Sequence, residues 1–437
     1  MLLTVLGIVV LVVGLLISVA IHELGHMVPA KRFGVRVSEY FVGFGPTLWS
    51  RKRGETEYGI KAIPLGGFVR LVGMIPPAEA VKPVRGTGWA ARLIADARDA
   101  SVAEVREGED ARAFYHLSWW KKVIVMAGGP LTNLVLAALL FTVVLVGFGV
   151  PQQTLTVREV MECVPSAGTV ECAAGDPASP ASQAGLLPGD TFVAVDGREV
   201  EVWSELTAYV AERPGESITF TVERGGAVTE LSMVPAVRER AVLDDAGQPV
   251  LDAAGEPVLE SVGFMGVFAE SERVQQPAGS GVELTGEYLT SMVPVIATLP
   301  VQVWHVSRAA LGYEERSQQS IMGVVGVGRT AGDIASADIE GYGVTEKLAD
   351  MLMLLGALNL ALFMFNMIPL VPLDGGHIAS ALWQGIKNGW ARLRGAARPR
   401  PVDVARMMPV AYGVFGLLIL MTVVLVYADI VAPVQIA

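Results

Sequence analysis

The sequence predicts a polytopic α-helical membrane protein with four transmembrane helices, a membrane-associated β-hairpin and an inserted extracytoplasmic domain of the β-rich α+β class. Hydrophobic residues make up 52% of the 437 residues and charged residues only 18%, a balance typical of membrane proteins. Four segments are apolar over lengths that can cross a hydrocarbon core of about 30 Å. A more polar stretch, rich in strand formers, separates the second segment from the third.

The four apolar segments predict transmembrane helices at residues 1–30, 123–150, 351–374 and 407–430. The first contains no charged residue from Leu2 to Ile21. Its position is that of a signal peptide, but it has no Lys or Arg before the apolar run and no small-residue cleavage site. We therefore expect it to be retained as a membrane span.

The net charge of −11 is unevenly distributed along the chain. Residues 31–122 hold 16 basic against 10 acidic residues, and 375–406 hold six against one, whereas 151–350 hold 11 against 30. Basic connections stay in the cytoplasm. The first and third connections are therefore predicted to face the cytoplasm, and the second connection and both termini are predicted to lie outside.

The first span ends with the motif H-E-x-x-H, formed by His22, Glu23 and His26. Residues i and i+4 of a helix face the same way, so the two imidazoles can bind one zinc ion. Glu23 then lies beside the metal, where it can accept a proton from the attacking water. Ionisable groups in an apolar span are costly unless they have a function. Helix rise places His22 and His26 roughly 8 to 14 Å below Lys31, inside the bilayer near its cytoplasmic face.

Two histidines leave zinc short of a protein ligand, because catalytic sites usually have three protein ligands plus water. The third span ends at Asp374, which is the only acid between Asp350 and Asp403 and lies at the same predicted depth as His26. We expect Asp374 to complete a His₂Asp site. The alternative is that it caps the turn before Gly375.

Two asparagines and two prolines precede Asp374. Asn359 and Asn366 are seven residues apart, so on a regular helix both amides face the same way. Pro369 and Pro372 break the helix and free backbone groups beside the metal.

Residues 31–122 are predicted to form a cytoplasmic or re-entrant β region and an amphipathic insertion. Residues 57–72 are rich in strand formers, and the stretch 64–67 within them indicates a hairpin turn or bend. This segment is either a small cytoplasmic hairpin or a strand pair that dips toward the metal and offers an edge to an extended substrate. In the insertion, Trp89 to Val105 predicts an amphipathic helix.

The second span begins with an interfacial anchor at residues 119–122, followed by the small residues Gly128 and Gly129. Small residues let another helix approach closely. Asn133 comes one turn later, and we interpret it as a packing hydrogen bond in preference to a chemical role.

Residues 154–268 predict an extracytoplasmic domain with a hairpin insertion, mostly β from Thr154 to about Ala236. Its central string is G-L-L-P-G-D-T-F-V-A-V-D-G at residues 185–197, followed by a helix near Trp203 to Ala211 and a strand from Ser217 to Glu223. The string resembles that of PDZ domains of the bacterial protease-associated type. The resemblance implies a peptide-binding or size-filtering module that uses β-strand addition.

The same outward segment contains Cys163 and Cys172, which can form a disulfide there or remain free thiols. Two near-copies of eight residues, at 244–251 and 252–259, predict a repeated turn in a surface hairpin. Residues 269–350 are predicted to form an interfacial amphipathic region. The glycines at 323–328 lack the strand, lysine and helix of a nucleotide loop, so we reject that reading.

The H-E-x-x-H of the first span, paired with N-x-x-P-x-x-P-L-D-G-G-H at residues 366–377, resembles the site-2 protease family of intramembrane zinc metalloproteases. The single outward PDZ-like domain is similar to the bacterial regulator of sigma-E protease type, particularly its actinobacterial branch. The resemblance implies that Glu23 is the catalytic base and that His22, His26 and Asp374 bind Zn²⁺. It further implies that Asn366 and Asn359 hold the substrate open, and that residues 57–71, including Gly66, Gly67 and Phe68, form a membrane-associated hairpin that presents the substrate strand.

The expected function is cleavage of single-span membrane proteins such as anti-sigma factors, after an upstream site-1-type protease has removed the outer domain. The expected location is the bacterial cell membrane, with the lipid bilayer as surroundings and no nucleic acid partner. Two alternatives are a zinc peptidase that acts on soluble cytoplasmic peptides and a non-catalytic membrane adaptor that binds through the PDZ-like domain. Burial of both ligand motifs in apolar spans argues against the first, and an intact Glu23 and Asp374 argue against the second.

Overall fold

The computed structural model describes residues 1–83, 88–164, 172, 176–242, 250, 252, 256–314, 316, 320–339, 342–397 and 399–434. The chain divides into two compact units. Unit 1 comprises Met1–Phe148 and Pro277–Ala437, and unit 2 comprises Gly149–Gln276. Each unit has its own buried core, so each is described by itself.

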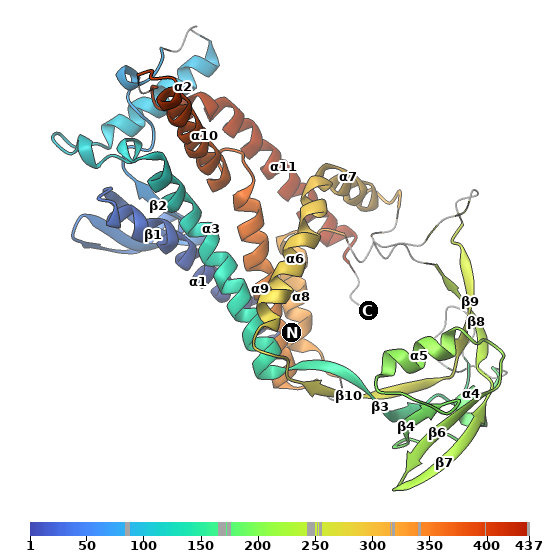
Figure 1. The fold of residues 1–437 in the computed structure, drawn as a ribbon. Coiled ribbons are helices and arrows are strands. Elements are labelled where there is room, and N and C mark those ends of the chain that lie inside the picture. Colours follow the sequence, from blue (N-terminus) through green and yellow to red (C-terminus); the bar gives the residue numbers. More distant parts are fainter. Residues whose placement is uncertain are drawn as a thin grey trace. The chain divides into compact units, whose positions relative to one another are not determined.

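Unit 1 is built mainly from helices (Figure 1). They are α1 (Leu2–Arg32), α2 (Trp89–Ala103), α3 (Trp119–Thr142), α6 (Ser280–Ala297), α7 (Leu299–Ala310), α8 (Val324–Ser336), α9 (Val344–Met367), α10 (Asp374–Leu393) and α11 (Met408–Val431). α3 packs against α1, α9, α10 and α6. α3 therefore lies at the centre of the unit.

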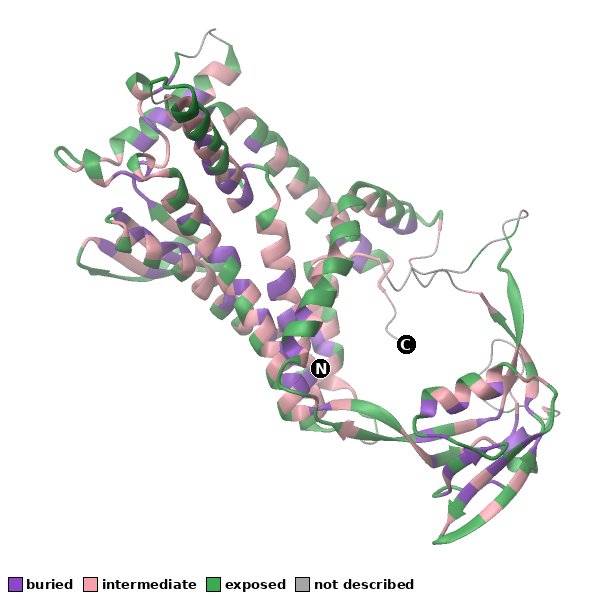
Figure 2. Cartoon of the chain, in the orientation of Figure 1, coloured by how far each residue is buried: buried purple, intermediate pink, exposed green. Residues whose placement is uncertain are grey.

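Four helical segments of unit 1 are long and apolar enough to cross a membrane, as the sequence predicts: Leu2–Arg32, Trp119–Phe148, Val344–Met367 and Val404–Val431. α6 and α7 pass the same test together but are bent by 71°. Pro294 in α6 and Pro300 at the start of α7 explain the break, because proline removes a backbone donor. Most residues of α11 are exposed or partly exposed, many of them large and apolar (Figure 2).

The β region of unit 1 is one antiparallel hairpin of β1 (Val37–Arg53) and β2 (Thr56–Leu71). The chain turns at Gly54, which has a φ of +64°. The predicted turn or bend at residues 64–67 coincides with a reversal inside β2, because Glu39 of β1 pairs with both Glu57 and Arg70, and Gly66 has a φ of +92°. Residues 64–67 lie inside β2, in a stretch where the register of the two strands is irregular. The first strand, β1, covers residues 37–53, which belong to the predicted β region but were not predicted as a strand.

The insertion after the hairpin contains the predicted helix, α2, and is anchored by an ion pair. Arg98 of α2 donates to both carboxylate oxygens of Asp403, at 2.9 and 2.8 Å, and both side chains are more than 90% buried. A second buried pair, Arg316 with Asp429, joins the segment before α8 to the end of α11. These two pairs attach the ends of α11 to other elements of unit 1.

Two predicted boundaries of unit 1 need correction. The third span was expected to continue to residue 374, but α9 ends at Met367, and Asp374 is the first residue of the next helix. The connection 375–406 was expected as a loop, yet most of it is the helix α10, which packs against α3. The sequence obscured this helix because it contains several glycines, which have low helix propensity.

Unit 2 is a six-stranded antiparallel sheet with one main helix. The strands are β3 (Val150–Val160), β4 (Thr191–Val195), β5 (Arg198–Glu199), β6 (Ile218–Arg224), β7 (Ala227–Met233) and β10 (Val267–Val274). Their order is β10-β3-β4-β6-β7, with β5 paired to β4. β10 extends the sheet to Val274, so the first residues of the region predicted as interfacial belong to this domain.

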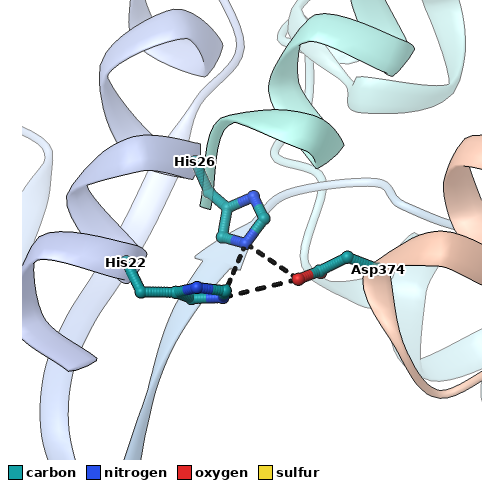
Figure 3. A group of neighbouring side chains, drawn as sticks. All are labelled: His22, His26 and Asp374. Atoms are coloured by element: carbon teal, nitrogen blue, oxygen red, sulfur yellow. Dashed lines mark hydrogen bonds and ion pairs between the residues drawn. The ribbon is translucent and has the colours of Figure 1, made fainter. Parts of the chain in front are cut away.

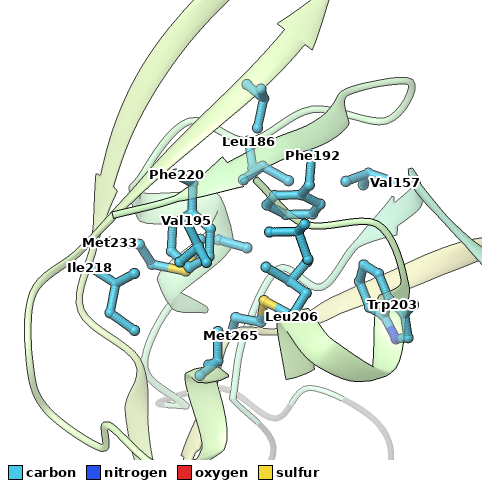
Figure 4. Close-up of a cluster of buried hydrophobic side chains, with 14 of the residues drawn as sticks. Val157, Leu186, Phe192, Val195, Trp203, Leu206, Ile218, Phe220, Met233 and Met265 are labelled. Atoms are coloured by element: carbon cyan, nitrogen blue, oxygen red, sulfur yellow. The ribbon is translucent and has the colours of Figure 1, made fainter. Parts of the chain in front are cut away.

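The helix α5 (Trp203–Ala211) has the predicted bounds and covers the core of unit 2 (Figure 4). Trp203, Leu206 and Val210 lie on its buried face and meet Phe192 and Phe220 from the sheet. Apolar residues spaced by three and four positions place this stripe on one side of the helix. A short helix, α4 (Pro180–Gln183), precedes the G-L-L-P-G-D string.

In that string, Asp190 is buried and bonded to Arg224 of β6, at 2.6 and 2.7 Å. The hydrogen bonds from Arg224 hold the pKa of the Asp190 carboxyl below its usual range.

The remaining features of unit 2 concern its second hairpin and its cysteines. β8 (Ala236–Ala241) pairs with β9 (Leu259–Phe264), which confirms a hairpin insertion. Most of the repeated segment 244–259 lies outside the described residues. Cys163 and Cys172 form a disulfide, so the alternative of two free thiols is wrong.

Candidate active site

The side chains of the H-E-x-x-H motif project from α1 on one side. The helix is regular through the motif, so His22 and His26 are one turn apart. Their Nε2 atoms lie 3.2 Å from each other, and the imidazole rings meet edge to face. Both rings are largely buried.

Asp374 completes a cluster of three donor atoms (Figure 3). Its Oδ2 atom lies 3.4 Å from Nε2 of His22 and 3.3 Å from Nε2 of His26. Among the described residues, this is the one group of His, Cys, Asp or Glu side chains that could hold a metal ion. The predicted ligands, which are about 350 positions apart in the sequence, therefore come together.

The dimensions of this triangle fit zinc. Ligand atoms about 2.0–2.1 Å from a tetrahedral zinc ion are separated by about 3.3 Å, which matches the three distances. The tautomer of His26 also fits, because its Nδ1 lies 2.8 Å from the carbonyl oxygen of Val125. A carbonyl only accepts, so this nitrogen carries the proton and Nε2 keeps its lone pair for a metal.

The chain between α9 and α10 brings Asp374 to the histidines. Residues 368–373 are not helical, and this stretch contains the two prolines predicted to break the helix. A Cβ on Gly375 would come within 2.3 Å of the carbonyl oxygen of Ile368. The first turn of α10 can therefore pack against residue 368 only because residue 375 has no side chain.

The glycines of α3 let it approach α1 beside the metal ligands. A Cβ on Gly128 would lie 2.0 Å from the carbonyl oxygen of Gly25, and a Cβ on Gly129 would lie 2.2 Å from Nε2 of His26. This confirms the expectation that these small residues admit another helix. That helix is the one carrying H-E-x-x-H.

The three ligand candidates and Glu23 open into a pocket of about 440 Å³. Gly66, Gly67 and Phe68 of β2 line it, as does Asn366 of α9. A Cβ on Gly67 would lie 3.4 Å from Cγ of Glu23, so β2 passes close to this side chain. The hairpin strand predicted to present a substrate therefore borders the predicted base.

Asn359 does not line the pocket, which corrects the expectation that it contacts the substrate. It is completely buried, and its amide donates to the hydroxyl of Ser18 at 3.0 Å. Asn359 and Asn366 do share one face of α9. Seven residues of helix separate them by about 10.5 Å along the axis, so one reaches the pocket and the other packs against α1.

The structure adds pocket residues that were not predicted individually as site residues. They are Val19, Leu71, Met74, Met126, Asn133, Leu362 and His377. His377 could have been found from its position one turn after Asp374. Asn133 also had a signal, because it follows Gly129 by four residues, the same spacing as in the histidine pair.

Comparison with known proteins decides the family. The model of peptidase family M50 matches residues 10–406. The chain belongs to this family, the site-2 proteases. The M50 chain is 34% identical to zinc metalloprotease Rip1 of Mycobacterium tuberculosis, over 98% of both chains. It is 31% identical to Rip1 of Mycolicibacterium smegmatis, over 99% of this chain and 98% of the relative. It is 28% identical to metalloprotease MmpA of Caulobacter vibrioides, over 87% and 88%.

Membership in M50 confirms the resemblance found from the motifs. The protein is a zinc metalloprotease with Zn²⁺ as its metal. Its apolar helices and its family make it a multi-pass membrane protein. The non-catalytic adaptor is therefore the weaker alternative.

Proposed function

We propose that this site-2 protease hydrolyses a peptide bond within or beside the membrane segment of a single-span protein, with His22, His26 and Asp374 as zinc ligands and Glu23 as base. The observation that carries the proposal is the triangle of donor atoms from α1 and α10, which lies beside Glu23 in a pocket of the helical unit. Among the described residues no second group of ligand side chains competes with it.

The chain supplies the ligands and the proton transfer. Zinc in this position supplies a Lewis acid that polarises the peptide carbonyl and makes the attacking water more acidic. Glu23 accepts the proton of that water and delivers it to the leaving amine. β2 passes beside Glu23, since a Cβ on Gly67 would lie 3.4 Å from its Cγ atom.

The hairpin is suited to hold the substrate in an extended form. Gly66, Gly67 and Phe68 present backbone along the pocket, and β2 pairs only with β1 in its sheet. An extended peptide can add to such a strand through main-chain hydrogen bonds. Asn366 lines the opposite part of the same pocket on α9 and can bond a peptide group of the unwound segment.

The charge distribution supports a topology in which unit 2 and both termini lie outside the cytoplasm. The connections around residues 31–122 and 375–406 are basic, and 151–350 is acidic. The disulfide in unit 2 fits an oxidising, extracytoplasmic environment. We place the protein in the bacterial cell membrane on these grounds.

Unit 2 is proposed to be a PDZ domain that restrains access of substrates. The sheet, the helix α5 and the G-L-L-P-G-D string support this assignment, and β10 is an edge strand of its sheet. A restraint of this kind fits substrates such as anti-sigma factors whose outer domain is first removed by another protease. A soluble cytoplasmic peptide would not need the apolar spans that surround the ligands.

The experiment is cleavage of a panel of single-span proteins by the purified enzyme, with and without a metal chelator. Substrates with short outer segments should be cut near or within their span, and chelation should stop the reaction. Readdition of zinc should restore it. Equal cleavage of soluble peptides that lack a span would contradict the proposed substrate class.

A further inference from the structure

A histidine that binds zinc through one ring nitrogen carries its proton on the other, and that N–H requires an acceptor. His22 and His26 converge on Asp374 through their Nε2 atoms. Acceptors are therefore required at both Nδ1 atoms, a requirement that rests on the proposed ligand set. Both Nδ1 atoms face residues of α3.

For His26 the acceptor is unambiguous. The backbone carbonyl of Val125 lies 2.8 Å from its Nδ1, in a fully buried contact. The ring is also covered by Gly129, whose missing side chain leaves room for the imidazole.

For His22 the residue that faces Nδ1 is Asn133, with its amide Nδ2 at 3.2 Å. Asn133 is 1% exposed, and its Oδ1 atom is buried with no hydrogen-bond partner among the described residues. A half-turn of the amide exchanges the two atoms. The exchanged orientation places Oδ1 against Nδ1 of His22.

The two orientations select different forms of His22. An amide N–H donating to Nδ1 would place the ring proton on Nε2, the atom that faces His26 and Asp374, and would leave Oδ1 without a partner. An amide oxygen accepting from Nδ1–H frees Nε2 to bind metal and gives Oδ1 a partner. Leaving a buried acceptor unpaired costs its full desolvation penalty, which favours the second orientation once the ligand is in place.

We propose that Asn133 is a positioning residue of the zinc site, and that its side-chain oxygen accepts the Nδ1 proton of His22 and so holds the imidazole in its metal-binding tautomer. The role differs from the packing hydrogen bond expected from the sequence. It supplies for His22 what the Val125 carbonyl supplies for His26.

The regular geometry of α3 explains how one helix serves both ligands. Val125, Gly129 and Asn133 recur every four residues, so they follow one another along one face. Gly129 lies against His26, and Asn133 lies one turn further on against His22. The four-residue step from Gly129 to Asn133 on α3 therefore matches the four-residue step from His26 back to His22 on α1. The two helices run in opposite directions at this contact.

The test measures zinc affinity of the purified full-length protein by competition with a chelator of known affinity. Asn133→Leu should weaken zinc binding by roughly 10–100-fold, the usual effect of losing a partner of a metal ligand. Asn133→Asp retains an oxygen acceptor and should bind zinc close to the wild-type affinity. The same affinity in the Leu variant as in wild type, or an Asp variant as weak as the Leu variant, would overturn the inference.

The matched control is Asn359→Leu, because Asn359 is an equally buried asparagine that bonds Ser18 and lies outside the pocket. It should leave zinc affinity unchanged. If Asn133→Leu does not fold, Asn133→Ala takes its place, because it also removes the oxygen acceptor and should weaken zinc binding in the same way. His22→Ala distinguishes an error in the proposed zinc-ligand set from an error in the role of Asn133. Unchanged affinity in that variant refutes the ligand set, whereas weakened affinity together with a normal Asn133→Leu refutes only the role of Asn133.

Discussion

His22 and His26 have their common orientation because four residues make slightly more than one helical turn. The residues beside the motif come from other elements: Gly67 of β2 lies next to Glu23, and the carbonyl of Val125 in α3 faces Nδ1 of His26. The motif supplies the reactive groups, and two neighbouring elements lie beside them. Substitutions can therefore separate chemistry from metal binding.

Glu23→Gln should lower the rate of peptide hydrolysis by at least about 10²–10⁴-fold, the usual contribution of a general base. Zinc content should remain that of wild type, because neither imidazole changes. Activity and bound metal are measured on the same preparation. Glu57→Gln on the hairpin, a residue that does not line the pocket, is the control and should retain activity. Loss of zinc from the Glu23 variant would indicate that this residue is a ligand.

Asp374→Ala should reduce both zinc affinity and activity, because it removes one of three protein ligands. The loss of affinity should exceed the roughly 10–100-fold typical of residues that only hydrogen-bond a ligand. Chelator competition measures it. Asp350→Ala, near the other end of α9, should bind zinc normally. Full zinc occupancy in the Asp374 variant would refute the His₂Asp assignment and direct attention to Asn366 or His377.

At the scale of elements, the close approach of β2 to α1 shapes the pocket. A Cβ on Gly67 would lie 2.9 Å from both the carbonyl oxygen of Phe41 and a methyl group of Val19, and 3.4 Å from Cγ of Glu23. The strand can lie beside the base only because residue 67 has no side chain. A larger residue must move β2 away from α1.

Gly67→Val should therefore reduce cleavage by about 10²-fold, since a displacement near 1 Å can cost that much, while zinc affinity stays unchanged. The proposed metal ligands lie on α1 and α10, not on β2. Steady-state kinetics and zinc titration check the two parts. Gly88→Val, where a Cβ meets open space, is the control. Wild-type kinetics in the Gly67 variant would show that β2 does not present the substrate.

At the scale of the whole molecule, the candidate active site belongs to one of the two units. Every residue that lines the pocket around Glu23 belongs to unit 1. The described residues of unit 2 contain no group of metal-ligating side chains. Unit 2 has a complete hydrophobic core of its own and can act as a separate module.

Replacing Gly149–Gln276 by a short Gly/Ser linker should leave a substrate that lacks its outer domain cleavable within about tenfold of the wild-type rate, a change of about 1.4 kcal/mol in barrier. An intact substrate should be cut faster than by wild type. Cleavage of both substrates is compared after membrane insertion and zinc content have been verified. Failure of a zinc-loaded, inserted deletion to cut the short substrate would mean that unit 2 is needed for docking.

Local patterns in the sequence correctly predicted the parts of the fold that depend on neighbours in the chain. The apolar spans, the helix α5 and the shared face of His22 and His26 follow from length and from a period of 3.6 residues. Asp374, selected from its predicted depth, does lie beside the two histidines, and its role as a metal ligand stays a prediction. The turn or bend at residues 64–67 was also predicted correctly, because glycine and proline mark such reversals within a strand pattern.

Thus the sequence by itself determined the family, the number of apolar spans and the residues that can bind zinc, because these are properties of composition and local periodicity. Only the tertiary structure decided that Asn366 faces the pocket and Asn359 faces Ser18, that β2 touches Glu23, and that Asn133 meets His22. Those contacts join residues between about 45 and 340 positions apart. They depend on the rotation and depth of one packed element against another, which no local pattern records.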